Sequence, residues 1–174
     1  MSAVCNEDLV YPPILMSDRD WGRLKRLVER AAVLHHPVSE LLETEVKRAA
    51  VYPSKDMPQD IVTMNSRVVF RAHDGADLES HVLVFPERYT PNGCCVSVTT
   101  PLGAALIGLR IGSSFPYRRP DGALVRVFVH DIAYQPEAAM RERAVRSPWK
   151  FDASDIDLLD NGFGPNGVHT PLVR

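Results

Sequence analysis

Residues 66–85 read SRVVFRAHDGADLESHVLVF, and this stretch has the pattern of two strands joined by a turn. Apolar and β-branched residues are frequent in 66–71 and in 79–85, while Asp74 and Gly75 lie between the two segments. β-Branched residues bounded by Asp and Gly are typical of a β-hairpin. The stretch therefore predicts a hairpin within a β-rich part of the chain.

Further strand and turn signals follow this hairpin. Residues 94–98 (CCVSV) alternate after a Pro-Asn-Gly turn, and 123–132 (ALVRVFVHDI) are long enough for a central strand. Between them, Pro101 suits the first position of a short helix and Gly108 suits its end. We therefore expect an α+β domain over residues 61–139, with an antiparallel sheet and one short helix.

Two helical segments precede this domain. Apolar residues recur at spacings of three and four from Trp21 onward, and Ser17 is suited to cap the helix. Pro37 interrupts the pattern, and a second helix is expected over 39–51. The pattern predicts a lead-in over 1–16, an antiparallel helical hairpin over 17–52 and a linker over 53–60. Arms of roughly 14 residues reach only about 20 Å.

Composition limits the class of protein and of partner. The chain has 174 residues, of which 45% are hydrophobic, and this suits one domain with appendages. Its net charge of −2 lacks the basic excess that drives phosphate binding, so sequence-specific nucleic-acid binding is not expected. No stretch approaches the roughly 20 apolar residues of a membrane span. We therefore expect a cytoplasmic protein without a membrane partner.

Signatures of catalysis are missing from the sequence. It contains no phosphate-binding loop, no nucleophile elbow and no zinc-ligand spacing, so we expect no catalytic, cofactor or metal site and no enzymatic activity. His35, His36 and Pro37 lie at the expected tip of the helical hairpin. Two adjacent imidazoles allow a metal hypothesis, but no further ligand is near them in sequence, so a solvated turn is the favoured interpretation.

The chain is expected to become irregular after Pro136. Residues 140–174 hold a basic stretch, an acidic stretch and a tail rich in glycine, which favours a partly disordered extension. Several apolar residues, among them Trp149 and Phe163, leave open that this extension docks on the body or on another subunit.

Three runs of the sequence resemble a known family, and they occur in the same order as in that family. They are residues 61–68 (IVTMNSRV), 100–112 (TPLGAALIGLRIG) and 134–139 (YQPEAA). They resemble the regulators of nucleoside diphosphate kinase (Rnk), a branch of the Gre transcription elongation factors, over roughly residues 18–139. The resemblance implies an FKBP-like C-terminal domain behind a short coiled coil, and binding of bacterial RNA polymerase near its secondary channel.

A docking segment follows from the same resemblance. Thr100, Pro101, Leu102 and Gly103 resemble the Ser-Pro-Leu-Gly element of Gre factors, and we expect them to form part of the polymerase-docking surface. Pro101 and Gly103 are also what a strand-to-helix junction requires, so a purely structural role stays open.

Gre factors that stimulate transcript cleavage carry acidic residues at the coiled-coil tip, which hold a metal ion. The turn at 33–39 has no carboxylate. We therefore expect a polymerase-binding regulator that competes with Gre factors at the secondary channel without stimulating cleavage. Two alternatives remain: a cleavage factor that uses Glu40 and Glu43, or a regulator that contacts nucleoside diphosphate kinase.

Overall fold

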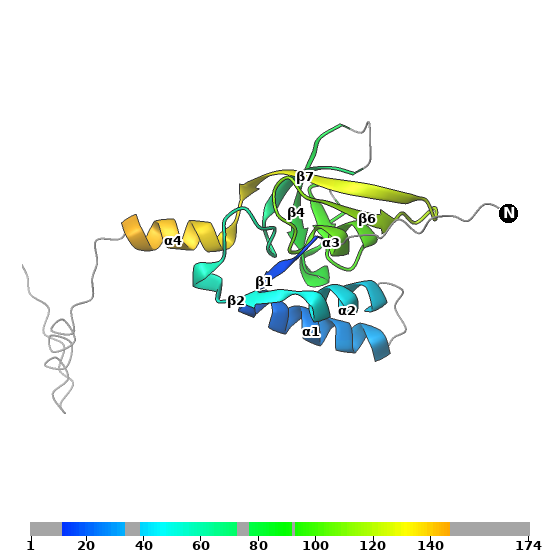
Figure 1. Cartoon of the computed structure of the whole chain (residues 1–174), viewed down its shortest axis with the longest axis horizontal. Coiled ribbons are helices and arrows are strands. Elements are labelled where there is room, and N and C mark those ends of the chain that lie inside the picture. Colours follow the sequence, from blue (N-terminus) through cyan, green and yellow to red (C-terminus); the bar gives the residue numbers. More distant parts are fainter. Residues whose placement is uncertain (1–11, 34–38, 73–76, 92, 147–174) are drawn as a thin grey trace, which may run out of the picture. The chain divides into compact units, whose positions relative to one another are not determined.

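The structure is a computed structural model that describes residues 12–33, 39–72, 77–91 and 93–146. Most of the helical residues precede the sheet (Figure 1). In chain order the elements are β1 (Leu15–Ser17), α1 (Asp18–Val33), α2 (Ser39–Arg48), β2 (Ala50–Tyr52), the 3₁₀ turn η1 (Ser54–Asp56), β3 (Arg67–Arg71), β4 (Glu79–Val84), the 3₁₀ turn η2 (Pro86–Arg88), β5 (Cys95–Ser97), α3 (Pro101–Leu106), β6 (Ser114–Arg118), β7 (Leu124–Tyr134) and α4 (Pro136–Arg146).

Five strands form a mixed sheet in the order β5-β4-β3-β7-β6. The predicted hairpin is confirmed as the antiparallel pair β3–β4, in which Arg67 lies opposite Val82. β7 is a long interior strand of 11 residues and pairs antiparallel with both β3 and β6. The expectation of a wholly antiparallel sheet is wrong at one edge, because β5 runs parallel to β4. The connection through η2 carries the chain back to the starting end of β4, as parallel neighbours require.

One hydrophobic core joins the helices to the sheet. The sheet contributes buried side chains from β3 and β7, such as Phe70 and Val129, and the helix pair contributes Leu24 and Leu42. Figure 1 shows α1 and α2 side by side on one side of the sheet. The α+β class and the helical hairpin are therefore confirmed, and the hairpin packs on the sheet domain.

Polar contacts at the start of α1 fix this packing. The Ser17 hydroxyl accepts a hydrogen bond from the Asp20 amide at 3.1 Å and caps the helix as expected. The Trp21 indole donates to the Val46 carbonyl on α2 at 3.1 Å. The Arg23 guanidinium lies 3.8 Å from the centre of the Phe85 ring, beside the end of β4. The first half of α1 is thus bonded to both α2 and the sheet domain.

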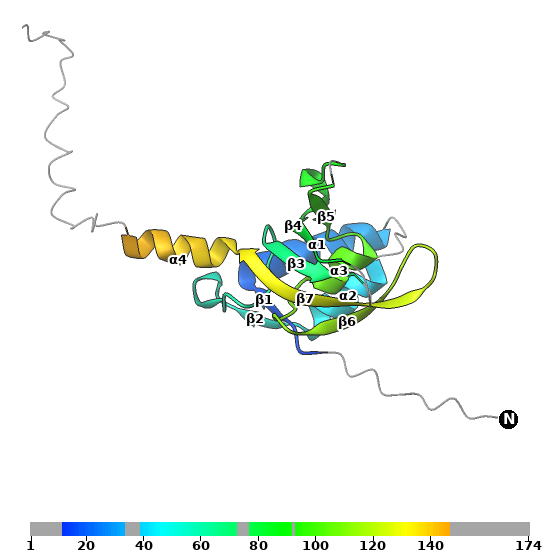
Figure 2. The same ribbon diagram turned by 90° about the horizontal axis from the view of Figure 1, so that it is seen from above.

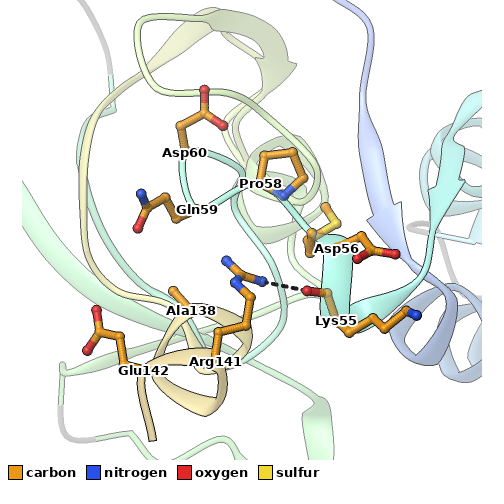
Figure 3. Close-up of a pocket in the computed structure, with 9 residues that line it drawn as sticks. Lys55, Asp56, Pro58, Gln59, Asp60, Ala138, Arg141 and Glu142 are labelled. Atoms are coloured by element: carbon orange, nitrogen blue, oxygen red, sulfur yellow. Dashed lines mark hydrogen bonds between the residues drawn. The ribbon is translucent and has the colours of Figure 1, made fainter. Parts of the chain in front are cut away.

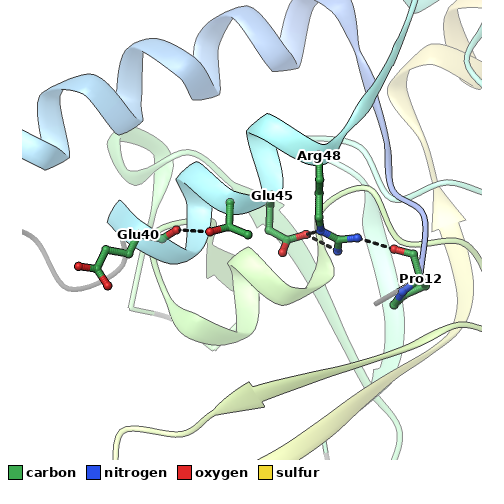
Figure 4. Close-up of polar contacts among 5 residues, drawn as sticks. Pro12, Glu40, Glu45 and Arg48 are labelled. Carbon is green, nitrogen blue, oxygen red and sulfur yellow. Dashed lines mark hydrogen bonds and ion pairs between the residues drawn. The ribbon is translucent and has the colours of Figure 1, made fainter. Parts of the chain in front are cut away.

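The lead-in and the end of α2 differ from the sequence-based expectation. β1 pairs in parallel with β2, and α2 ends at Arg48 instead of continuing to residue 51. Figure 4 shows the polar contacts at this end of α2. The buried Glu45 carboxylate accepts from Arg48 Nε at 2.8 Å, and Arg48 Nη1 donates to the Pro12 carbonyl at 2.6 Å. Arg48 thereby binds the N-terminal segment beside the chain that leaves α2.

The expectation of irregular structure directly after Pro136 is wrong, because α4 covers Pro136–Arg146. Proline is favoured at the first position of a helix, and the alanines and arginines that follow are good helix formers. The remainder of the predicted extension, 147–174, lies outside the described residues. None of the helices in the described part of the chain has the length and apolar composition of a membrane span.

Candidate functional site

The expected docking segment forms the junction between β5 and α3. The Thr100 hydroxyl donates to the Ser97 carbonyl at 2.8 Å and accepts from the Gly103 amide at 3.0 Å, so Thr100 is the N-cap of α3. A Cβ atom on Gly103 would lie 2.0 Å from the Ser97 carbonyl oxygen. Thr100 and Gly103 therefore have structural roles at this junction.

Pro101 and Leu102, the other two residues of the segment, border a pocket. Both are half-buried, and both line a pocket of about 290 Å³ between the two edge strands of the curled sheet. The pocket wall is mostly apolar, with two tyrosines and one arginine; the other lining residues are Tyr89, Cys95, Val96, Ser97, Thr100, Tyr117, Arg119 and Pro120. A pocket of this size and lining suits an apolar side chain presented by a protein partner.

Sequence reasoning did not find the far wall of this pocket. Tyr89 follows η2, whereas Tyr117 and Arg119 lie at the end of β6, and the curvature of the sheet brings both segments to α3. No local motif marks them. Tyr117 also belongs to the core: its side chain is buried, and its hydroxyl donates to the Ala72 carbonyl at 3.2 Å.

The three runs that carried the family resemblance meet at one structural junction. The backbone of Val62 bonds in both directions with the segment after α3, because its amide donates to the Leu109 carbonyl at 2.8 Å and its carbonyl accepts from the Gly108 amide at 2.9 Å. Gln135, between β7 and α4, donates from Nε2 to the Ile61 carbonyl at 2.8 Å. The hydroxyl of Thr63 donates to the Glu137 carboxylate at 2.7 Å. The three runs are thus bonded to one another in the structure.

A buried carboxylate joins α1 to this junction. Asp20 is 6% exposed, and its Oδ2 accepts from the Met64 amide at 3.0 Å. Burial raises the pKa of Asp20 to about 6; the Met64 hydrogen bond opposes this shift and the negative charge of Glu137 adds to it. Its hydrogen-bond partners are the Met64 amide and the Ser17 side chain, which gives it a structural role.

The helical tip and its nearby acids bear on the cleavage hypothesis. His35, His36 and Pro37 lie outside the described residues. On α2, the Glu43 carboxylate pairs with Lys47 at 2.6 Å, and Glu40 is exposed. In the part of the chain that the structure describes, no group of three or more His, Cys, Asp or Glu residues is placed to hold a metal ion.

A second hollow, of about 630 Å³, lies between the segment after β2 and α4 (Figure 3). Arg141 Nη1 donates across it to the Lys55 carbonyl at 3.3 Å. Its lining mixes both signs of charge, with Lys55 and Arg141 beside Asp56 and Glu142. This mixture favours no single class of ligand.

Comparisons with known proteins place these features in a family. A model of the C-terminal domain of the transcription elongation factors GreA and GreB matches residues 57–134. Regulators of nucleoside diphosphate kinase from Escherichia coli K12 and Shigella flexneri are each 39% identical to the chain over 128 residues, which cover 74% of this chain and 94% of theirs. GreA from Clostridium botulinum (strain Alaska E43) is 31% identical over 81 residues, 47% of this chain and 51% of its own.

A solved structure supports the same relationship. It is described as the prokaryotic transcription elongation factor GreA/GreB from Nitrosomonas europaea, and it matches with a TM-score of 0.58 at 34% identity. The match covers 70% of this chain and 99% of that one.

Proposed function

This chain belongs to the GreA/GreB family, in the branch of the regulators of nucleoside diphosphate kinase, and we propose that it regulates transcription by binding bacterial RNA polymerase at the secondary channel. Family membership supports a role as a regulatory factor and not as an enzyme. The finer proposal is that the chain competes there with Gre factors.

The docking proposal rests on the different roles of the residues within 100–103. Thr100 and Gly103 are explained by the junction that they build. Leu102 is not required for the cap, yet it lines a mostly apolar pocket together with Pro101. An apolar hollow with tyrosines and an arginine has the composition that protein interfaces favour. We assign the polymerase contact to this pocket, which we call the α3 pocket.

The packing of the helix pair supports competition without cleavage. α1 has 16 residues, which corresponds to about 24 Å of helix. Its first half is bonded to the sheet domain through Asp20 and Arg23, so that only part of its length extends beyond these contacts. A short helix pair held in this way does not carry Glu40 or Glu43 far from the body.

A competition experiment tests the docking proposal. Core RNA polymerase is immobilised with a labelled Gre factor, and the chain is added at micromolar concentration. We expect displacement of the Gre factor by the wild-type chain and strongly weakened displacement by a Pro101→Ser/Leu102→Ser variant. Met140→Ser is the matched control, because Met140 is 57% exposed and lies outside the pocket. Absence of binding by the wild type, or equal binding by the pocket variant, would contradict the proposal.

Cleavage is tested separately on an arrested elongation complex. We expect that the added chain does not shorten the transcript. If shortening occurs, the Glu40→Gln/Glu43→Gln variant decides its origin, because loss of shortening in this variant would establish the chain as a cleavage factor with an unusual carboxylate pair.

A contact with nucleoside diphosphate kinase is a second candidate function. It is favoured by the relatives that are 39% identical, which are described as regulators of that kinase. Purified kinase and purified chain are expected to bind directly if regulation is by contact. If the two proteins do not bind measurably, regulation of the kinase by direct contact is contradicted, and the transcriptional proposal alone stays.

A further inference from the structure

One face of the sheet is not covered by α1, α2 or α3. Figure 2 views the molecule from the side on which β7 lies in front of α1 and α2. Along β3 and β7, one set of alternating side chains is fully buried in the core; it includes Phe70, Val127 and Val129. The residues that alternate with them therefore point the other way. We call the surface that they form the outer face.

The outer face has a strong local excess of positive charge. β3 contributes Arg67 and Arg71, β6 contributes Arg118, and β7 contributes Arg126, all of them exposed. Asp131 is the one carboxylate that the register of the described strands places on this face. Arg67, Arg71 and Arg126 form no ion pair within the described part of the chain. The whole chain has a net charge of −2, so the excess of positive charge on this face is local.

Two exposed aromatic rings lie among these arginines. Phe128 is 39% exposed and Tyr134 is 49% exposed. The register places Arg71 directly opposite Phe128 and Arg67 directly opposite Tyr134, so each ring has an arginine as its cross-strand neighbour. Directly opposite residues have Cβ atoms only about 5 Å apart. The outer face thus repeats one pairing, an aromatic residue opposite an arginine, at two points along β7.

This arrangement matches the chemistry of a single nucleic-acid strand. Exposed rings on a sheet stack on unpaired bases, and guanidinium groups beside them bind the phosphates. A purely acidic protein surface would satisfy the arginines but would leave the two rings without a stacking partner. We propose that the outer face binds single-stranded nucleic acid, with Phe128 and Tyr134 as stacking residues and Arg67, Arg71 and Arg126 as phosphate ligands. The binding does not depend on the α3 pocket.

The test is fluorescence anisotropy with labelled oligonucleotides of about 12 nucleotides, a length within the range of known single-strand sites. Single-stranded RNA, single-stranded DNA and a duplex of the same sequence are compared with the full chain. We expect both single strands to bind more tightly than the duplex, and the RNA and DNA arms show which strand is preferred. Affinity should fall as salt rises from about 50 to about 200 mM.

Three variants separate stacking from charge. Phe128→Leu/Tyr134→Leu should weaken binding at least about fivefold while leaving the salt dependence unchanged. Arg71→Ala/Arg126→Ala should weaken binding by a similar factor and reduce the slope against log salt by about 1.4. Arg26→Ala/Arg30→Ala on α1 removes the same charge from exposed positions elsewhere, and it should change affinity less than about twofold.

Several results would overturn the proposal. These are absence of binding to either single strand, equal binding of the duplex, no effect of the aromatic variant, or an equal loss in the α1 control. The last result would show that binding follows net charge and not the outer face. Urea unfolding of each variant verifies that the fold is retained, and Arg71→Lys/Arg126→Lys, which keeps both charges, should retain most of the binding.

Discussion

At Gly103 the absence of a side chain allows α3 to approach β5. A Cβ atom there would meet the Ser97 carbonyl oxygen at 2.0 Å and the Val98 Cα at 2.9 Å, both of them backbone atoms that cannot rotate away. We expect Gly103→Ala to lower the free energy of unfolding by about 1–3 kcal/mol. Gly22→Ala is the control, because the added Cβ would meet nothing within 4 Å beyond its chain neighbours and its own helix backbone, and it should raise stability by about 0.5–1 kcal/mol. Urea denaturation measures both; an unchanged midpoint for Gly103→Ala would contradict the assignment.

Asp20 makes stability depend on pH. Its pKa is raised from 3.8 to about 6 by burial, so the folded chain binds more protons than the unfolded chain between about pH 4 and 6. Stability therefore falls as pH rises through this window, by about 3 kcal/mol at most for this group. Asp20→Asn keeps an acceptor for the Met64 amide and removes the titration. We expect the variant to be less sensitive to pH than the wild type and more stable at pH 7.

The control for this prediction has the opposite sign. Asp18 is exposed, and the hydrogen bond from the Ser54 hydroxyl lowers its pKa. Its contribution is therefore present at neutral pH and is lost as pH falls through the lowered pKa. Asp18→Asn should lower stability at pH 7 and should not flatten the fall between about pH 4 and 6. Equal pH profiles for wild type and Asp20→Asn, measured by urea unfolding, would show that the Asp20 carboxylate titrates normally.

At the scale of elements, the shared core predicts that the helix pair and the sheet unfold together. Leu42 on α2 is 1% exposed and belongs to the same core as Phe70 on β3. We expect Leu42→Ala to lower the free energy of unfolding by about 2–5 kcal/mol. Trp21 fluorescence, in a Trp149→Phe background, should report the same transition as far-UV circular dichroism. Leu124→Ala, at a position 58% exposed, should have little effect, and two separate transitions would mean that the helices form a unit of their own.

The elements that sequence predicted correctly are those with a local signal. The β3–β4 hairpin has β-branched strands, α1 has Ser17 as its cap, and α3 has Thr100 and Pro101. α4 has a proline at its first position, but none of its residues is buried, so no apolar stripe marks it as a helix. β1 and β2 have three residues each, too few for a detectable period. The parallel direction of β5 depends on the path of the chain around the sheet, which local pattern does not encode.

The candidate site was predictable to the same extent. The motif at 100–103 could be singled out because it is contiguous; its docking role stays a prediction, and the structure shows that Thr100 and Gly103 build the junction. The outer face was not found because its residues are separated along the chain. Arg71 and Phe128 are brought together by the pairing of β3 with β7, and the net charge of −2 conceals the local excess of arginine.

At the scale of the whole molecule, the two proposed surfaces belong to different parts of the domain. The α3 pocket is formed by α3 with the edge strands, and Tyr117 on its wall points to the core side of β6. The outer face is formed by the opposite side chains of β3, β6 and β7. Because no lining residue of the pocket belongs to the proposed nucleic-acid site, the two activities should be separable by mutation.

Separability predicts a crossed pattern of losses. Pro101→Ser/Leu102→Ser should lose polymerase binding and bind single-stranded oligonucleotide as the wild type does, whereas Phe128→Leu/Tyr134→Leu should show the reverse. Both variants are measured in the same polymerase competition and anisotropy assays, together with a combined variant whose losses should equal the separate ones. A loss of both activities in either double variant would mean that the surfaces are coupled through the sheet. The crossed pattern would instead show that one small domain holds a protein partner with one side of its sheet while the other side remains available to a nucleic-acid strand.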